Sequence, residues 1–225
     1  MKNQFLIFCF VFLLFGCKQS FDLSKEIPGA YSMIQQDITQ GDKTTTYKDL
    51  KQLKIYTGTH FMYTQINPGD STVSFGVGSY TTDKDTLREH SIYSSHDSTF
   101  ENQPRDYNLV IKITPEAYNQ AAGYNQTIKD FMIDGKKSTL LEIYSRVKDT
   151  LTSPLDGVWK EVKSFMVVDN DTLPNDRTQY KAYFRGYFMF GNTVRIGPSK
   201  TTSGMGYGTY KLINDKEIEE TDLNS

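Results

Sequence analysis

The chain repeats its own pattern once, and this internal duplication limits the folds that are open to it. Gly29 is matched by Gly157 and Gly58 by Gly186, both at an offset of 128 positions. A glycine-rich stretch at 76–80 is matched, two positions out of step, at 204–210. The repeated unit is longer than the repeats that stack into solenoids. We therefore expect one small domain to be present twice.

Apolar residues alternate with polar ones along most of the chain, which is the pattern of β-strands. The clearest strand runs from Tyr107 to Ile113, where every second residue is apolar. Glycine-containing turns at 57–59 and 134–135 join neighbouring strands into hairpins. About eight antiparallel strands fit into 28–147 by this pattern. We expect an all-β, up-and-down barrel there, with a β-sandwich as the competing architecture.

One short helix is predicted from Pro115 to Ala122. Thr114 supplies an N-cap, proline suits the first helical turn, and Gly123 ends the segment. We expect this helix to plug or flank the sheet of the first copy.

The duplication also divides the chain. We expect the first barrel over 28–147, a linker over 148–155 and a second copy over 156–225. The second copy stops where the first still adds a strand, the helix and a hairpin, so we expect it to be an incomplete repeat. Its inner face would then be exposed and would carry Trp159, Phe184 and Phe190.

Three explanations are open for this incomplete copy. The chain is a truncated form of a longer protein, the second copy docks on the first, or its edge pairs with another chain. We favour truncation, because the stretch 222–225 has neither proline nor clustered charge to guard an edge. On that hypothesis 156–225 is aggregation-prone and poorly protected in hydrogen exchange, whereas 28–147 unfolds cooperatively.

The N-terminus has the pattern of an export signal. Lys2 precedes an apolar run over 5–15, which ends at Gly16-Cys17 and is too short to span a bilayer. These last residues resemble the lipobox of bacterial lipoproteins, with an ordinary secretory signal as the alternative. The resemblance implies a signal peptide over 1–16, lipidation of Cys17, and a polar tether over 17–27 that holds the protein to a membrane.

Composition and residue spacing exclude several classes of function. The chain has 25 basic and 27 acidic residues, so no basic excess favours nucleic acid. The three histidines, His60, His90 and His96, lack the spacing of a metal site, and no Gly-x-Ser-x-Gly elbow provides a nucleophile. We expect no enzyme activity, no metal and no cofactor.

Short motifs in both copies resemble those of lipocalin-like domains in secreted and lipid-anchored proteins of Bacteroidetes-type bacteria. They are Gly-Ala-Tyr at 29–31 and Gly-Val-Trp at 157–159, a Phe-Met pair after each glycine turn, and the glycine-rich strands. The resemblance implies a barrel whose interior holds a small apolar ligand. With the lipobox, it implies a protein anchored in the bacterial cell envelope, at the outer membrane or the cell surface.

We expect this lipid-anchored barrel to bind a small apolar or amphipathic molecule through the inward aromatic side chains of the first copy. The candidate ligand-binding residues are Tyr31, Tyr56, Phe61, Tyr63 and Tyr80. The alternative is a structural or protein-interaction module of the envelope, with a packed barrel and no ligand. A cavity of roughly a few hundred Å³ in the first copy would favour the ligand, and a filled interior would favour the alternative.

Overall fold

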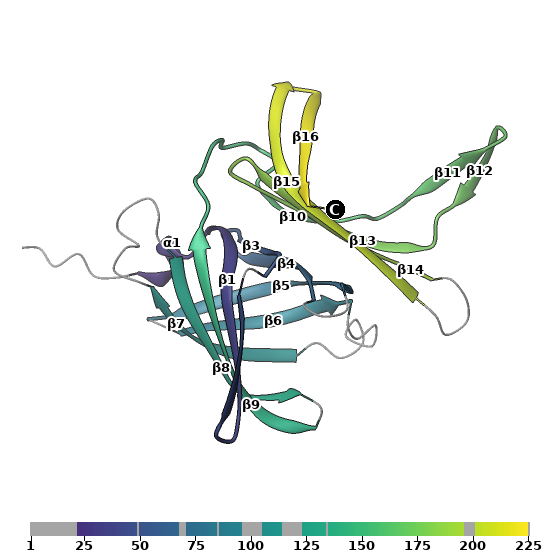
Figure 1. Ribbon diagram of the computed structural model, residues 1–225. Helices are drawn as coiled ribbons and strands as arrows, with labels where there is room; N and C mark the ends of the chain where they lie inside the picture. The colour runs from purple at the N-terminus through teal and green to yellow at the C-terminus, as the bar shows by residue number, and fades with distance from the viewer. Residues whose placement is uncertain are drawn as a thin grey trace, which may run out of the picture.

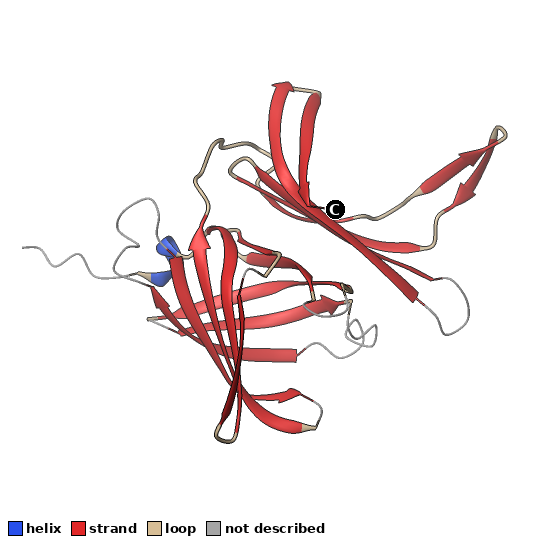
Figure 2. Ribbon diagram, viewed as in Figure 1, coloured by secondary structure: helices blue, strands red, loops and turns tan. Residues whose placement is uncertain are grey.

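The computed structural model is built almost entirely of antiparallel β-strands, accompanied by one short helix among the described residues (Figure 2). The described residues are 22–48, 50–67, 71–84, 86–95, 105–113, 123–133, 135–195 and 201–224. Cys17 and the helix predicted over 115–122 lie outside these ranges.

The first copy forms a closed barrel (Figure 1). Its strands are β1 (Gly29–Gln40), β2 (Lys43–Lys48), β3 (Gln52–Tyr56), β4 (His60–Ile66), β5 (Val73–Asp83), β6 (Thr86–Ser94), β7 (Arg105–Ile113), β8 (Gly123–Ile133) and β9 (Lys136–Arg146). Successive strands from β3 to β9 pair around the wall, and β9 pairs back with β1. β1 pairs with β3 through its first part and with β2 through its last part. Eight strands, β1 and β3 to β9, thus close the barrel, and β2 is an extra strand beside the last part of β1. The antiparallel eight-stranded barrel predicted from the sequence is confirmed.

A β-bulge in β1 changes which of its residues face the interior. The bulge lies between Met33 and Gln35, and Ile34 within it is half exposed. Met33 faces the barrel core before the bulge, whereas Gln36 faces the interior after it. Because side chains alternate along a strand, Gln36 would point outwards without this extra residue.

The residues just before β1 close one end of the barrel. Helix α1 (Leu23–Glu26) begins after Asp22, whose side chain accepts a hydrogen bond from the Ser24 amide. Leu23 and Ile27 are buried in the barrel core. The predicted tether over 17–27 therefore differs from the structure, in which residues from 22 onwards belong to the barrel. Burial of its two apolar side chains explains the difference.

The second copy is an open sheet. Its strands β10 (Gly157–Lys160), β13 (Arg177–Phe184), β14 (Tyr187–Arg195), β15 (Thr201–Asn214) and β16 (Glu217–Asn224) pair in the order β10-β13-β14-β15-β16. β11 (Phe165–Val168) and β12 (Asp171–Pro174) form a separate hairpin that extends away from this sheet (Figure 1).

The duplication is visible at the level of single hydrogen bonds. In the first copy the Tyr31 hydroxyl donates to the carbonyl of Ile27, at 2.9 Å. In the second copy the Trp159 indole N–H donates to the carbonyl of Leu155, also at 2.9 Å. Each aromatic residue thus ties its strand to the chain four residues earlier.

The second sheet packs against the outer wall of the barrel. An apolar layer joins them and consists of Ala30, Leu53, Ile55, Met62, Phe75, Val77 and Tyr93 from the barrel and of Tyr180, Ala182, Phe184 and Met189 from the second sheet. Docking, one of the three explanations for the incomplete copy, is thus present in the structure. Phe184 was expected on the exposed inner face, but it lies in this buried layer because strand alternation turns it towards the barrel. Trp159, which is 50% exposed, and Phe190 lie on the opposite face.

Candidate functional site

The barrel interior is filled with apolar and aromatic side chains at the α1 end. Tyr31 and Tyr124 meet edge to face, with ring centroids 4.7 Å apart, and Tyr56 packs in the same way against Tyr80 at 5.2 Å. Burial raises the pKa of Tyr31 to about 12, so its phenol stays neutral. This end of the barrel is therefore a packed aromatic core.

A buried ion pair lies directly above this core. Lys54 on β3 and Glu89 on β6 are 2.7 Å apart, and their side chains are only 4% and 8% exposed. The Tyr56 hydroxyl donates a 2.5 Å hydrogen bond to the same Glu89 oxygen. The Lys54 ammonium also lies 5.0 Å from the centroid of the Tyr56 ring. The two charges therefore compensate each other, and Tyr56 beneath them contacts both side chains.

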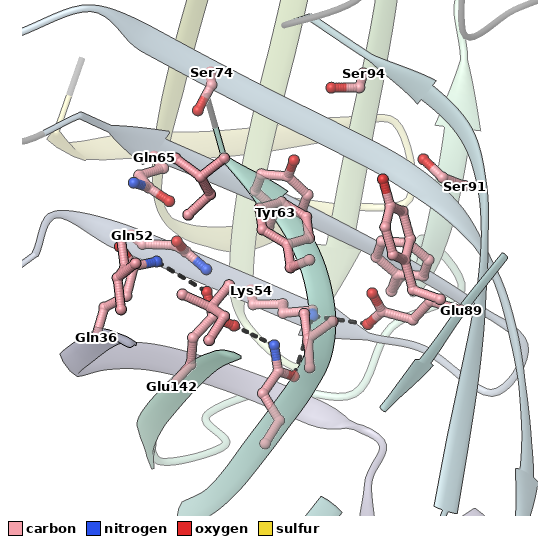
Figure 3. Close-up of a pocket in the computed structure, with 18 of the residues that line it drawn as sticks. Gln36, Gln52, Lys54, Tyr63, Gln65, Ser74, Glu89, Ser91, Ser94 and Glu142 are labelled. Carbon is pink, nitrogen blue, oxygen red and sulfur yellow. Dashed lines mark hydrogen bonds and ion pairs between the residues drawn. The ribbon is translucent and has the colours of Figure 1, made fainter. Parts of the chain in front are cut away.

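A second buried carboxyl, that of Glu142 on β9, collects hydrogen bonds from three strands. It accepts from the Gln36 amide at 3.1 Å, from the Tyr144 hydroxyl at 3.0 Å, and from the Gln126 amide. Lys54 Nζ reaches Gln126 Oε1 at 3.4 Å, which joins the two carboxyls in one network (Figure 3). Burial raises the pKa of Glu142 above its ordinary value, against the opposing effect of Lys54. Burial thus disfavours the charged form of the Glu142 carboxyl.

A cavity of about 860 Å³ occupies the barrel above these networks. Its lower wall carries Gln36, Gln52, Lys54, Glu89 and Glu142, and Figure 3 shows these side chains gathered around the space. Side chains from β4, β5 and β6 also line the cavity, namely Tyr63, Gln65, Ser74, Ser91 and Ser94. Tyr63 and Gln65 stand directly beside Lys54 and Gln52 of the neighbouring strand. The middle of the cavity is thus rich in hydrogen-bonding groups.

The end of the cavity far from α1 is more apolar. It is lined by Ile38 near the end of β1, by Ile128 and the 131–133 segment on β8, and by Leu140 on β9, while the exposed Lys129 and Asp130 stand at its rim. Since β8 runs away from α1 and β9 returns, these residues surround the end opposite the packed core. The cavity therefore passes from polar in its depth to apolar towards this end.

The five aromatic residues predicted as a ligand site all face the barrel interior, but at two levels. Phe61 and Tyr63 line the cavity. Tyr31, Tyr56 and Tyr80 belong to the packed core below it. The Tyr56 hydroxyl supports Glu89 from beneath the cavity, and the Tyr80 hydroxyl donates to the Thr57 carbonyl at 2.5 Å. The structure thus brings together two of the five at the cavity itself.

Sequence reasoning missed the polar side chains of the cavity: Gln36, Gln52, Lys54, Glu89, Gln126 and Glu142. In β3 the alternation of Gln52, Lys54 and Tyr56 with Leu53 and Ile55 is visible in the sequence. Such a strand is normally assigned a wet polar face and a buried apolar face. Here the polar side faces the interior, and the apolar side is buried under the second sheet. Only the docking of the two copies reveals this assignment.

Comparisons with protein-family models and with curated proteins found no match for this chain. Within the described ranges, no three His, Cys, Asp or Glu side chains come together as a metal site would require. No helix of the described segments has the length and hydrophobicity of a membrane span.

Proposed function

We propose that the barrel binds a small amphipathic molecule. The observation that carries this proposal is the cavity of about 860 Å³, which is polar in its depth and apolar towards one end. Its volume falls in the range of about 300–1,000 Å³ that small-molecule sites occupy. A filled interior, which the alternative of a purely structural barrel requires, is difficult to reconcile with this space.

The charges in the cavity favour a ligand whose polar group is uncharged. Lys54 is already paired with Glu89, and burial raises the pKa of Glu142 above its ordinary value. In the buried depth of the cavity a charged ligand group would have to compete with the Lys54–Glu89 ion pair for a counter-ion, which is costly. Hydroxyl, amide or ester groups would instead exchange hydrogen bonds with Gln36, Gln126 and Glu142.

The proposal includes the cellular setting implied by the N-terminus. A lipid anchor on Cys17 would hold the barrel at the bacterial cell envelope, as in lipocalin-like lipoproteins of Bacteroidetes-type bacteria. The lipobox-like residues before Cys17 support this part of the proposal. An anchored binder of amphiphiles is a non-enzymatic function.

The test combines ligand extraction with a probe. Purified full-length protein is extracted with organic solvent for mass spectrometry, and it is titrated with the neutral fluorescent amphiphile N-phenyl-1-naphthylamine. Ser91→Phe places a ring in the cavity, whereas Thr81→Phe places the same ring on the exposed side of β5 as a matched control. We expect Ser91→Phe to abolish the fluorescence increase and Thr81→Phe to keep it. Equal signals from all three proteins would exclude the cavity as the site.

A further inference from the structure

The second sheet reproduces a barrel wall in detail. Lys181 and Glu220 form an ion pair of 2.6 Å, and the Tyr183 hydroxyl donates a 2.5 Å hydrogen bond to the same Glu220 oxygen. These contacts repeat those of Lys54, Glu89 and Tyr56 in the first copy. Strand β16, which carries Glu220, therefore stands in the position that β6 holds in the barrel.

The two equivalent strands differ in what lies beyond them. In the barrel, β6 pairs on its far side with β7, with Glu89 opposite Tyr107. In the second copy β16 is the last strand of its sheet, and in the described part of the chain no strand pairs with its far side. An edge of this kind presents backbone N–H and C=O groups to any extended segment that can reach it.

The side chains near this edge indicate what would bind there. β16 carries Glu217, Glu219, Glu220 and Asp222 and contains no basic residue. Apolar side chains stand among them, because Ile218 is 36% and Leu223 62% exposed. A second copy of β16 placed alongside would set acidic residues against acidic residues, which is destabilising. A segment with basic and apolar residues fits both the charge and the exposed apolar surface.

We infer that the second sheet binds an extended, basic polypeptide segment, which adds to β16 as an antiparallel strand. The segment takes the place that β7 takes beside β6, and its apolar side chains lie next to Ile218 and Leu223 of β16. Main-chain hydrogen bonds supply affinity, and the acidic strand selects basic sequences. This binding is independent of the cavity in the barrel.

The probe is a nine-residue peptide with the sequence of β7, Arg105–Ile113, because this strand pairs with the equivalent edge in the barrel. One version replaces its aspartate (Asp106→Lys), and a charge-reversed version carries Arg105→Glu and Lys112→Glu. Binding to the full-length chain is measured by fluorescence anisotropy, and hydrogen exchange locates the protected amides. We expect the basic peptide to bind about tenfold more tightly than the acidic one, because opposite charges stabilise strand pairs.

Variants of the chain complete the test. Glu217→Lys with Glu219→Lys should invert the preference between the two peptides, whereas Asp42→Lys with Asp83→Lys, in exposed barrel turns, should leave it unchanged. New amide protection should appear along 217–224. Equal affinity for the basic and acidic peptides, or protection elsewhere, would overturn the inference. So would concentration-dependent protection of β16 without peptide, because the occupant would then be a second copy of this chain.

Discussion

The ring of Phe75, on barrel strand β5, packs directly against the backbone of Gly191 on strand β14 of the second sheet. A Cβ atom on residue 191 would stand 2.2 Å from Cγ of that ring, well inside any permitted contact. This close approach lets the two sheets meet around Phe75 in the apolar layer. The contact between the two copies therefore requires glycine at position 191, because any larger residue would collide with Phe75.

The first prediction concerns this contact. Gly191→Ala should destabilise the docked arrangement by about 1–3 kcal/mol, the usual range for overpacking a buried site. Trp159 is the only tryptophan and lies in the second copy, so its fluorescence reports on that copy during urea unfolding. Gly157→Ala is the control, because its Cβ would meet nothing closer than 3.5 Å. Combining Gly191→Ala with Phe75→Ala should restore part of the loss. If the single variant unfolded like wild type, the packing described here would be incorrect.

The second prediction compares the two equivalent lysines. Lys54→Met leaves Glu89 buried without its partner and should cost about 3–5 kcal/mol of unfolding free energy. Lys181→Met removes the same contact where both side chains are about a quarter exposed, at 26% and 27%, and should cost about 1 kcal/mol or less. Chemical denaturation measures both variants. Adding Glu89→Leu to Lys54→Met should recover most of the stability, and similar losses from the two single variants would contradict the role assigned to burial.

The third prediction follows from the raised pKa of Glu142. The folded protein holds this proton more tightly than the unfolded chain does, so the protonated carboxyl stabilises the fold. Its contribution to the free energy of unfolding is complete below the ordinary pKa of 4.5 and is lost as the pH rises through the pKa of the folded protein. Glu142→Gln carries no such proton. The stability difference, wild type minus Glu142→Gln, should therefore fall as the pH is raised above the ordinary pKa of 4.5 in urea titrations. A stability difference that is constant or rises with pH would show that the pKa of Glu142 is not raised in the folded protein.

The fourth prediction concerns the proposed anchor. Several acyl chains on Cys17 would give stable attachment to a membrane, at about 0.8 kcal/mol for each buried CH₂ group. Cys17→Ser should therefore move the protein from the detergent phase to the aqueous phase in phase partitioning. Cys9→Ser is the control, since that cysteine lies within the predicted signal peptide. Retention of Cys17→Ser in the detergent phase would exclude lipidation as the means of attachment.

The sequence predicted correctly the turns and strands that depend on neighbouring residues. The glycine turn at 57–59 joins β3 to β4 as expected, and the alternation from Tyr107 to Ile113 forms β7. The repeated glycines indicated the duplication, which the matched bonds of Tyr31 and Trp159 display. These features depend on backbone conformation and on the period of a strand, both of which neighbouring residues determine.

The candidate site was less accessible to sequence reasoning, because long-range pairing decides it. Gln36 reaches the cavity only through the bulge at Ile34, which shifts the alternation of β1 by one residue. From the sequence alone, Lys54 and Glu142 would be assigned to the surface. They are buried in the structure because they face the interior of the closed barrel, while the second sheet covers the outer wall. Aromatic residues were expected to form the site, yet Tyr31 and Tyr80 are used to fill the closed end.

The apolar outer wall under the second sheet has a consequence for how the two copies can exist. A barrel that is soluble on its own has a mostly polar outer surface. Here the outer surface of one flank is apolar and is formed by Leu53, Ile55 and Met62. A protein reduced to the first copy would show that flank to every other molecule around it. The second copy therefore keeps this flank out of water, and the first copy on its own should tend to associate through it.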